Sequence, residues 1–170
     1  GVYKGQFRNF LNKVAGSTLM CAMILAGCGG ETPESMLASA RNYMANNDNK
    51  AAAIQLKNAL QKNPDLGEAR FLLGKTLLDG GESTSAEIEL RKAKDLNYSA
   101  DQVVPLLART QLMLGQPKKV TEDLAKVQLT SPESKADLLV TTGQAYLMMG
   151  NIDASQTAFD EALAAVPGYG

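Results

Sequence analysis

Apolar residues recur from about residue 34 onward at intervals of three and four, the pattern of a helix with one buried face. Short stretches that contain glycine, asparagine or proline divide this pattern into eight segments. We therefore predict helices at residues 34–46, 49–62, 67–79, 83–95, 102–114, 118–129, 136–149 and 152–165. Pro105 then falls in the first turn of its helix, where a residue without an N–H group is tolerated. The pattern predicts an all-α protein.

The same residue types return every 34 or 35 residues. Small residues occur at Ala40, Gly74, Ala108 and Gly143, and bulky residues at Leu56, Leu90, Leu124 and Phe159. Turn residues that can adopt the left-handed conformation follow the first helix of each pair, at Asn47, Gly81, Gly115 and Gly150. Helix, tight turn and second helix thus form a unit that occurs about four times, with breaks near Pro64, Pro132 and Pro167.

Gly74 lies inside a predicted helix, where glycine costs about 1 kcal/mol relative to alanine. In a helical hairpin, a side chain at this phase would hold the two backbones apart. We therefore interpret the small series, Ala40, Gly74, Ala108 and Gly143, as the residues that pack the first helix of each unit against its neighbours.

The unit resembles the tetratricopeptide repeat (TPR), a helical hairpin with small, aromatic, bulky and proline residues at set positions. The fourth unit matches at Gly143, Tyr146, Phe159, Ala162 and Pro167, and the first at Ala40, Tyr43, Ala52, Leu56, Ala59 and Pro64. The third unit departs most, because Gln111 occupies the aromatic position. The resemblance implies repeats at residues 33–66, 67–100, 101–135 and 136–170, stacked into a right-handed superhelical solenoid.

The TPR resemblance also implies that the first helices line a groove. A mainly basic row shares one helical phase at Arg41, Lys75, Arg109 and Gln144. A mainly acidic row lies seven residues earlier, at Glu34, Glu68, Gln102 and Asp137. Apolar residues lie between the rows, at Leu37, Phe71, Pro105 and Val140.

The predicted partner-binding residues are Arg41, Phe71, Lys75, Arg109 and Gln144. A basic row of this kind could hold the carboxylates of an extended peptide or of an acidic glycan. The alternative is that the charged rows only pair with each other, an interaction that contributes little to stability at a surface.

The composition of the chain excludes some classes of function. The net charge of −1 provides no basic face for nucleic acid, and the absence of histidine removes the commonest general base and metal ligand. Pairs such as Glu87 and Glu89 are expected to be solvated surface charges rather than acid–base catalysts. We find no cofactor motif and no metal-binding spacing, so we expect a non-enzymatic binding protein without a cofactor.

The first 30 residues differ from the rest. Lys4, Arg8 and Lys13 are the only charges before Glu31, and an apolar stretch follows them. This order is typical of a secretory signal, and the charge-free stretch at residues 14–30 is short for a helix that spans a bilayer.

The sequence Leu25-Ala26-Gly27-Cys28 resembles the lipobox of bacterial lipoproteins. That resemblance implies a signal peptide at residues 1–27, lipid attachment at Cys28 and a tether at residues 28–32. The alternatives are an uncleaved membrane anchor or an unmodified cysteine after an ordinary secretory signal. Gly29, which stands where aspartate would retain an inner-membrane lipoprotein, implies the outer membrane of a Gram-negative bacterium, on its periplasmic side.

The stretches AAIQLKNALQKNPDLGEARFLLG, AEIELRKAKDL and DQVVPLLAR, together with the lipobox, resemble the amino-terminal part of TPR-repeat lipoproteins of PEP-CTERM protein sorting and exopolysaccharide loci. This implies an envelope-anchored scaffold for other envelope proteins or extended peptides. A pilotin-like outer-membrane assembly factor and a glycan-binding module of a polysaccharide-export protein are the alternatives. Those relatives are longer, and no capping helix follows residue 167, so we expect a fragment of a longer product.

Overall fold

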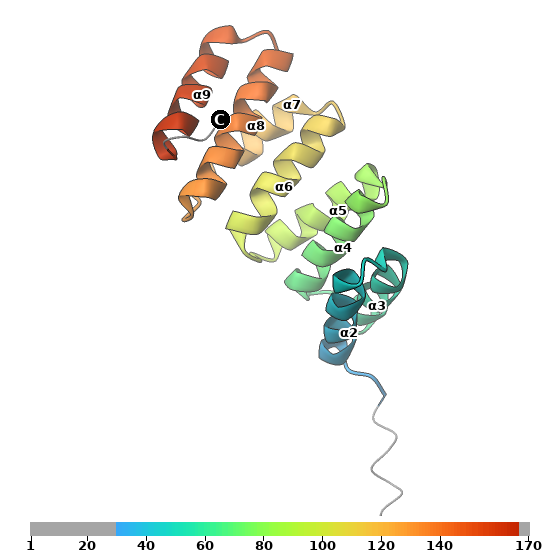
Figure 1. Ribbon diagram of the computed structural model, residues 1–170. Coiled ribbons are helices and arrows are strands. Elements are labelled where there is room, and N and C mark those ends of the chain that lie inside the picture. Colours follow the sequence, from blue (N-terminus) through green and yellow to red (C-terminus); the bar gives the residue numbers. More distant parts are fainter. Residues whose placement is uncertain (1–29, 167–170) are drawn as a thin grey trace, which may run out of the picture. The chain divides into compact units, whose positions relative to one another are not determined.

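The structure, a computed structural model, describes residues 30–166, and every regular element in this range is helical. Residues 33–166 form one compact unit (Figure 1). Its elements are α2 (Pro33–Ala45), α3 (Asn49–Lys62), α4 (Gly67–Asp79), α5 (Ser83–Asp95), α6 (Ala100–Met113), α7 (Pro117–Lys119), a π-helical turn η1 (Val120–Leu124), α8 (Pro132–Met148) and α9 (Ile152–Ala165). The predicted signal peptide, Cys28, Gly29 and Pro167 lie outside the described residues.

The helices form hairpins that pack in chain order. α2 packs on α3, α4 on α5 and α8 on α9, while α3 contacts α4, α5 contacts α6 and α6 contacts α8. The all-α prediction is confirmed, and the arrangement is a helical solenoid; its right-handed superhelix stays a prediction. None of the described helices is long and apolar enough to cross a membrane.

The turns within the hairpins use the left-handed conformation that the sequence pattern indicated. Asn47 has a φ of 58°, and Gly81, Gly115 and Gly150 have φ values of 81°, 69° and 77°. These turns end the first helix of each pair and bring the second helix back alongside it. The predicted bounds of the first five helices and of the last agree with the structure to within two residues.

Two predicted bounds in the third and fourth repeats are wrong. The helix expected at 118–129 ends at Leu124, and the helix expected at 136–149 begins at Pro132. The Ser131 hydroxyl accepts a hydrogen bond from the amide of Ser134 and so caps α8, and Pro132 occupies the first turn. This start signal lies four residues before the predicted start, so the predicted boundary at residues 135 and 136 falls inside α8.

The second helix of the third repeat is short because the chain turns inward after it. The amide of Ala125 donates to the carbonyl of Val120 at 2.9 Å, a π-type hydrogen bond that widens the last turn. The chain then leaves the helix and places Leu129 in the core, where it is 5% exposed. Leu129 therefore contributes to the apolar core although the helix has already ended at Leu124.

Asp101, at the start of α6, holds the segment after η1. Its Oδ1 accepts hydrogen bonds from the amides of Thr130 at 2.8 Å and Ser131 at 3.3 Å, and its Oδ2 accepts one from the Thr130 hydroxyl. The Thr130 hydroxyl and amide, in that order, lower the pKa of Asp101 below its ordinary value. The ionised carboxylate therefore stabilises the join between the third and fourth repeats.

The expected position of Pro105 also needs correction. α6 begins at Ala100, so the buried Pro105 lies in its second turn rather than its first. Proline has no N–H group, so it makes no hydrogen bond to the carbonyl of Asp101. The helix tolerates this loss in a position where the ring is packed in the core.

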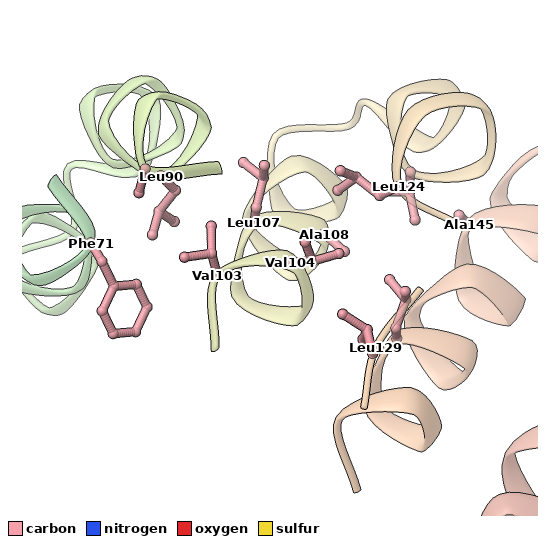
Figure 2. Close-up of a cluster of buried hydrophobic side chains, with 12 residues drawn as sticks. Phe71, Leu90, Val103, Val104, Leu107, Ala108, Leu124, Leu129 and Ala145 are labelled. Carbon is pink, nitrogen blue, oxygen red and sulfur yellow. The ribbon is translucent and has the colours of Figure 1, made fainter. Parts of the chain in front are cut away.

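The core is continuous along the stack. One cluster joins α2, α3, α4 and α5 around Leu56 and Leu73. A second joins α4 to α8, and Figure 2 shows Leu90 and Phe71 facing Val103 of α6. Leu72 and Leu78 pack against both clusters. Each hairpin thus buries its apolar face against the next one.

The small and bulky series meet inside each hairpin. A Cβ atom added at Gly74 would lie 2.7 Å from Cγ of Leu90, and one added at Gly143 would lie 2.5 Å from Cε1 of Phe159. Ala40 and Ala108 occupy the equivalent positions in the other repeats and are fully buried. The first helix therefore approaches the second so closely that a bulky residue on one requires a small residue on the other.

We predict that Gly74→Ala lowers the free energy of unfolding, because the added Cβ would lie 2.7 Å from Cγ of the fully buried Leu90, which would have to move. Overpacking costs about 1–3 kcal/mol, and the gain in helix propensity recovers about 1 kcal/mol. In a Leu90→Ala background the same substitution is expected to stabilise. Chemical denaturation of the four variants of this cycle measures the effect.

Gly80→Ala is the matched control, because an added Cβ there would meet no atom closer than 3.5 Å and the residue has a negative φ. It should not reproduce the loss. A Gly74→Ala variant more stable than the parent chain would contradict the close packing at Leu90.

We predict that Asp101→Asn lowers the melting temperature at neutral pH. Because the pKa of Asp101 is lower in the folded state, its stabilisation is complete above the ordinary aspartate pKa of about 4 and is lost as pH falls through the lower folded-state value. The difference in melting temperature between the two proteins should be constant near neutrality and disappear in acid. A difference that is independent of pH down to the lowest values would show that the charge of Asp101 is not involved.

Candidate functional site

The first helices α2, α4, α6 and α8 carry the two predicted charged rows, and two ion pairs link neighbouring helices. Arg41 of α2 approaches Glu68 of α4, with Nη2 at 2.6 Å and Nε at 2.9 Å from the same Oε1. Arg109 of α6 approaches Asp137 of α8, with Nη2 3.6 Å from Oδ2. These links join the first repeat to the second and the third to the fourth. All four side chains are partly exposed.

The corresponding link between α4 and α6 is missing. Lys75 occupies the basic position, but the acidic position of the next repeat holds the neutral Gln102. The Nζ atom of Lys75 lies 5.8 Å from the ring centroid of Phe71, and no carboxylate of the described residues pairs with it. Lys75 is therefore an exposed cation between two neutralised links. Gln144, at the end of the row, is exposed as well.

Phe71, one of the predicted partner-binding residues, is almost completely buried, and its binding role stays a prediction. It is 6% exposed, and its ring packs on Tyr98 with centroids 5.6 Å apart and planes tilted by 36°. This contact joins α4 to the segment between α5 and α6. Lys75 covers the ring on the outside, where a cation–π contact of this kind holds the ammonium in place.

Tyr98 is a residue of this surface that the sequence analysis did not select. It stands where the other repeats have proline. This difference from the repeat pattern is the feature of the sequence that could have pointed to Tyr98. Burial and the nearby Glu68 carboxylate raise the pKa of Tyr98, and Arg41 opposes them. Its hydroxyl therefore stays protonated at neutral pH and can donate a hydrogen bond.

Glu87 and Glu89 are not the solvated charges that we expected. Glu87 is 5% exposed, and Gln111 Nε2 donates to its Oε1 at 3.2 Å. Arg91 Nη2 and Lys119 Nζ lie 3.5 and 3.6 Å from its two oxygens. Glu89 pairs with the part-buried Arg70 at 2.7 Å. The glutamine in the aromatic position of the third repeat thus partners a buried carboxylate of the second.

Within residues 30–166 no group of three or more histidine, cysteine, aspartate or glutamate side chains could hold a metal ion. The charged groups of the first helices lie on an open surface and pair with each other across the repeats. Such an arrangement can bind a charged segment of another molecule through hydrogen bonds and ion pairs.

Stacked α-hairpins that pack only on their neighbours define a helical repeat protein. Residues 37–100 match the model of the tetratricopeptide repeat family. Residues 37–100 thus resemble tetratricopeptide repeats, and the described part of the chain has the fold of TPR proteins, which generally serves as a scaffold for interactions between proteins and is typically non-enzymatic. No curated protein matches the chain.

Solved structures show the same fold at low sequence identity. Two crystal structures of the MamA protein match with TM-scores of 0.67 and 0.64 at 21% and 20% identity. Each match covers 78% of this chain, and 72% and 77% of the respective MamA chains. YrrB, a TPR protein described as having an unusual peptide-binding site, matches with a TM-score of 0.52 at 14% identity over 79% of this chain and 87% of its own.

Proposed function

We propose that the repeats form a scaffold that binds an extended acidic segment of another envelope protein across the first helices. The observation that carries this proposal is Lys75, a cation that pairs with no carboxylate of residues 30–166 and lies between two ion-paired links. The description of YrrB as a peptide-binding TPR protein supports a peptide as the partner. The TPR fold supports a binding function rather than catalysis.

The electrostatics of the row favour an acidic ligand at this point. Glu68 and Asp137 neutralise the charge of Arg41 and Arg109, so those two cations attract a further carboxylate less strongly than Lys75 does. The ammonium of Lys75 has three donors, and in the described part of the chain it has no carboxylate partner to displace. A ligand carboxylate at Lys75 would complete the missing link, and the ligand chain could extend along the row toward Arg41 on one side and Arg109 on the other.

The location of this scaffold is also part of the proposal. The lipobox at residues 25–28 supports a lipid anchor on Cys28, and the resemblance to PEP-CTERM-system TPR lipoproteins supports a role in protein sorting or exopolysaccharide assembly at the outer membrane. An anchored scaffold would hold its partners close to the membrane surface and raise their local concentration.

We predict that Gln102→Glu weakens binding of an acidic peptide although Lys75 itself is unchanged, because the new carboxylate completes the third link. The probe is a fluorescein-labelled peptide with four glutamates, followed by anisotropy at low salt, with a four-glutamine peptide as the neutral probe. An exposed ion pair contributes up to about 1 kcal/mol, so affinity should fall about threefold to fivefold. Lys75→Glu should reduce it further.

The matched control is Lys126→Glu, which makes the same change in net charge at an exposed position after η1. It should leave the affinity close to that of the parent chain. Equal losses in Lys75→Glu and Lys126→Glu would show that the peptide responds to net charge alone and would overturn the proposed site.

A second prediction concerns the anchor. Bacteria that express the chain with its own leader and are supplied with labelled palmitate should incorporate the label, and Cys28→Ala should abolish this incorporation. Cys21→Ala is the matched control, because it removes the other cysteine of the chain without touching the lipobox. Undiminished labelling of the Cys28→Ala protein would refute the lipid anchor.

A further inference from the structure

Two pockets between successive helices occupy equivalent places in successive repeats. The first, about 500 Å³, is lined by α3, α4 and α5, and the second, about 420 Å³, by α5, α6 and the η1 turn. Lining residues of the first recur 34 positions later in the second, so that Lys57, Leu73 and Leu77 correspond to Arg91, Leu107 and Gln111. One crevice therefore repeats along the stack.

The chemistry of this crevice changes between the two repeats. Leu77 lies in the first pocket where Gln111 lies in the second, and Ile88 of the first corresponds to Glu122 of the second. Gln61 is likewise replaced by Asp95, and Leu60 by Lys94. The first pocket keeps several buried leucines, whereas the second has a polar lining at the same places.

Gln111 leaves one hydrogen-bonding atom of this second pocket without a partner. The side chain is 3% exposed, and its Oε1 accepts no hydrogen bond from any described residue. Its orientation is determined by Glu87, because a carboxylate only accepts and so the amide must direct its Nε2 toward it. The carbonyl oxygen is therefore held away from Glu87. A buried acceptor without a donor costs free energy, and a ligand that donates to it would recover that cost.

The charges around this acceptor are mainly negative. Asp95, Glu122 and Asp123 line the pocket, are exposed and form no ion pair among the described residues. Lys94 and Arg91 are the cations of the lining, and Arg91 already pairs with Glu87. Three carboxylates thus exceed the two cations at a site that also offers an unpaired carbonyl oxygen. A positively charged donor satisfies both features.

We propose that this pocket binds the ammonium group of a lysine side chain on a partner protein. The ammonium supplies the donor that Gln111 Oε1 lacks and the charge that the carboxylates attract. Leu107 and Leu124 line the same pocket, so their backbone amides report on an ammonium group bound there. This surface is separate from the charged rows of the first helices and selects the opposite charge.

The test is an NMR titration of the isotopically labelled chain with Nα-acetyl-lysine methylamide. We expect saturable shifts of the Gln111 side-chain amide and of the backbone amides of Leu107 and Leu124. The Nε-acetylated derivative removes the charge and should produce no such shifts. The Nε-trimethylated derivative keeps the charge but has no ammonium N–H group, so it should bind more weakly.

Glu122→Gln combined with Asp123→Asn should weaken binding roughly fivefold, because two exposed carboxylates lose their charge. Asp153→Asn combined with Glu161→Gln makes the same change in net charge on α9 and should leave the affinity unchanged. All four residues are exposed, so these variants should keep the melting temperature of the parent chain. Lys75→Glu, which tests the other surface, should also have no effect here.

Equal shifts with the lysine probe and its Nε-acetylated form would overturn the proposal, as would shifts that do not saturate. Equal affinity in the two double variants would overturn it too, because the pocket carboxylates would then have no specific role.

Discussion

The structure depends on close contact between the two helices of each hairpin. At Gly74 and Gly143 the backbone of the first helix lies so near Leu90 and Phe159 that a single added carbon atom would overlap them. This contact sets the distance between the helices, and through it the position of every exposed residue on the first helices. The spacing of Arg41, Lys75 and Arg109 across the stack follows from the same contact, because each lies one residue after a small packing position.

The periodic residues made the fold predictable. Small, bulky and turn residues that recur every 34 or 35 positions have one consistent explanation, and six of the eight predicted helices lie where expected to within two residues. The helix bounds in the third repeat were predicted wrongly, because contacts between residues far apart in the sequence determine where the helix ends. The burial of Leu129 and the hydrogen bonds of Asp101 to residues 130 and 131 involve partners about 30 positions apart, and no local propensity reveals them.

The candidate site was predictable only in part. The rows of charge could be read from the helical phase, but the sequence left open whether they pair. The structure shows pairing at Arg41 and Arg109, which leaves Lys75 without a carboxylate partner among the described residues because Gln102 is neutral. Phe71 is buried because Tyr98, a residue of another segment, covers it. The burial of Glu87 likewise depends on Gln111 of the next repeat. In each case the deciding neighbour lies more than 20 residues away.

The shortened second helix of the third repeat has a mechanical consequence. In a stack of this kind each hairpin touches only its neighbours, so cooperativity is transmitted through every repeat in turn. The second helix of the third repeat ends at Leu124, and the irregular segment that follows is held by one carboxylate and one buried leucine. We expect amide protons to exchange fastest there, and the hairpins on either side to separate at this junction when the chain is pulled from its ends.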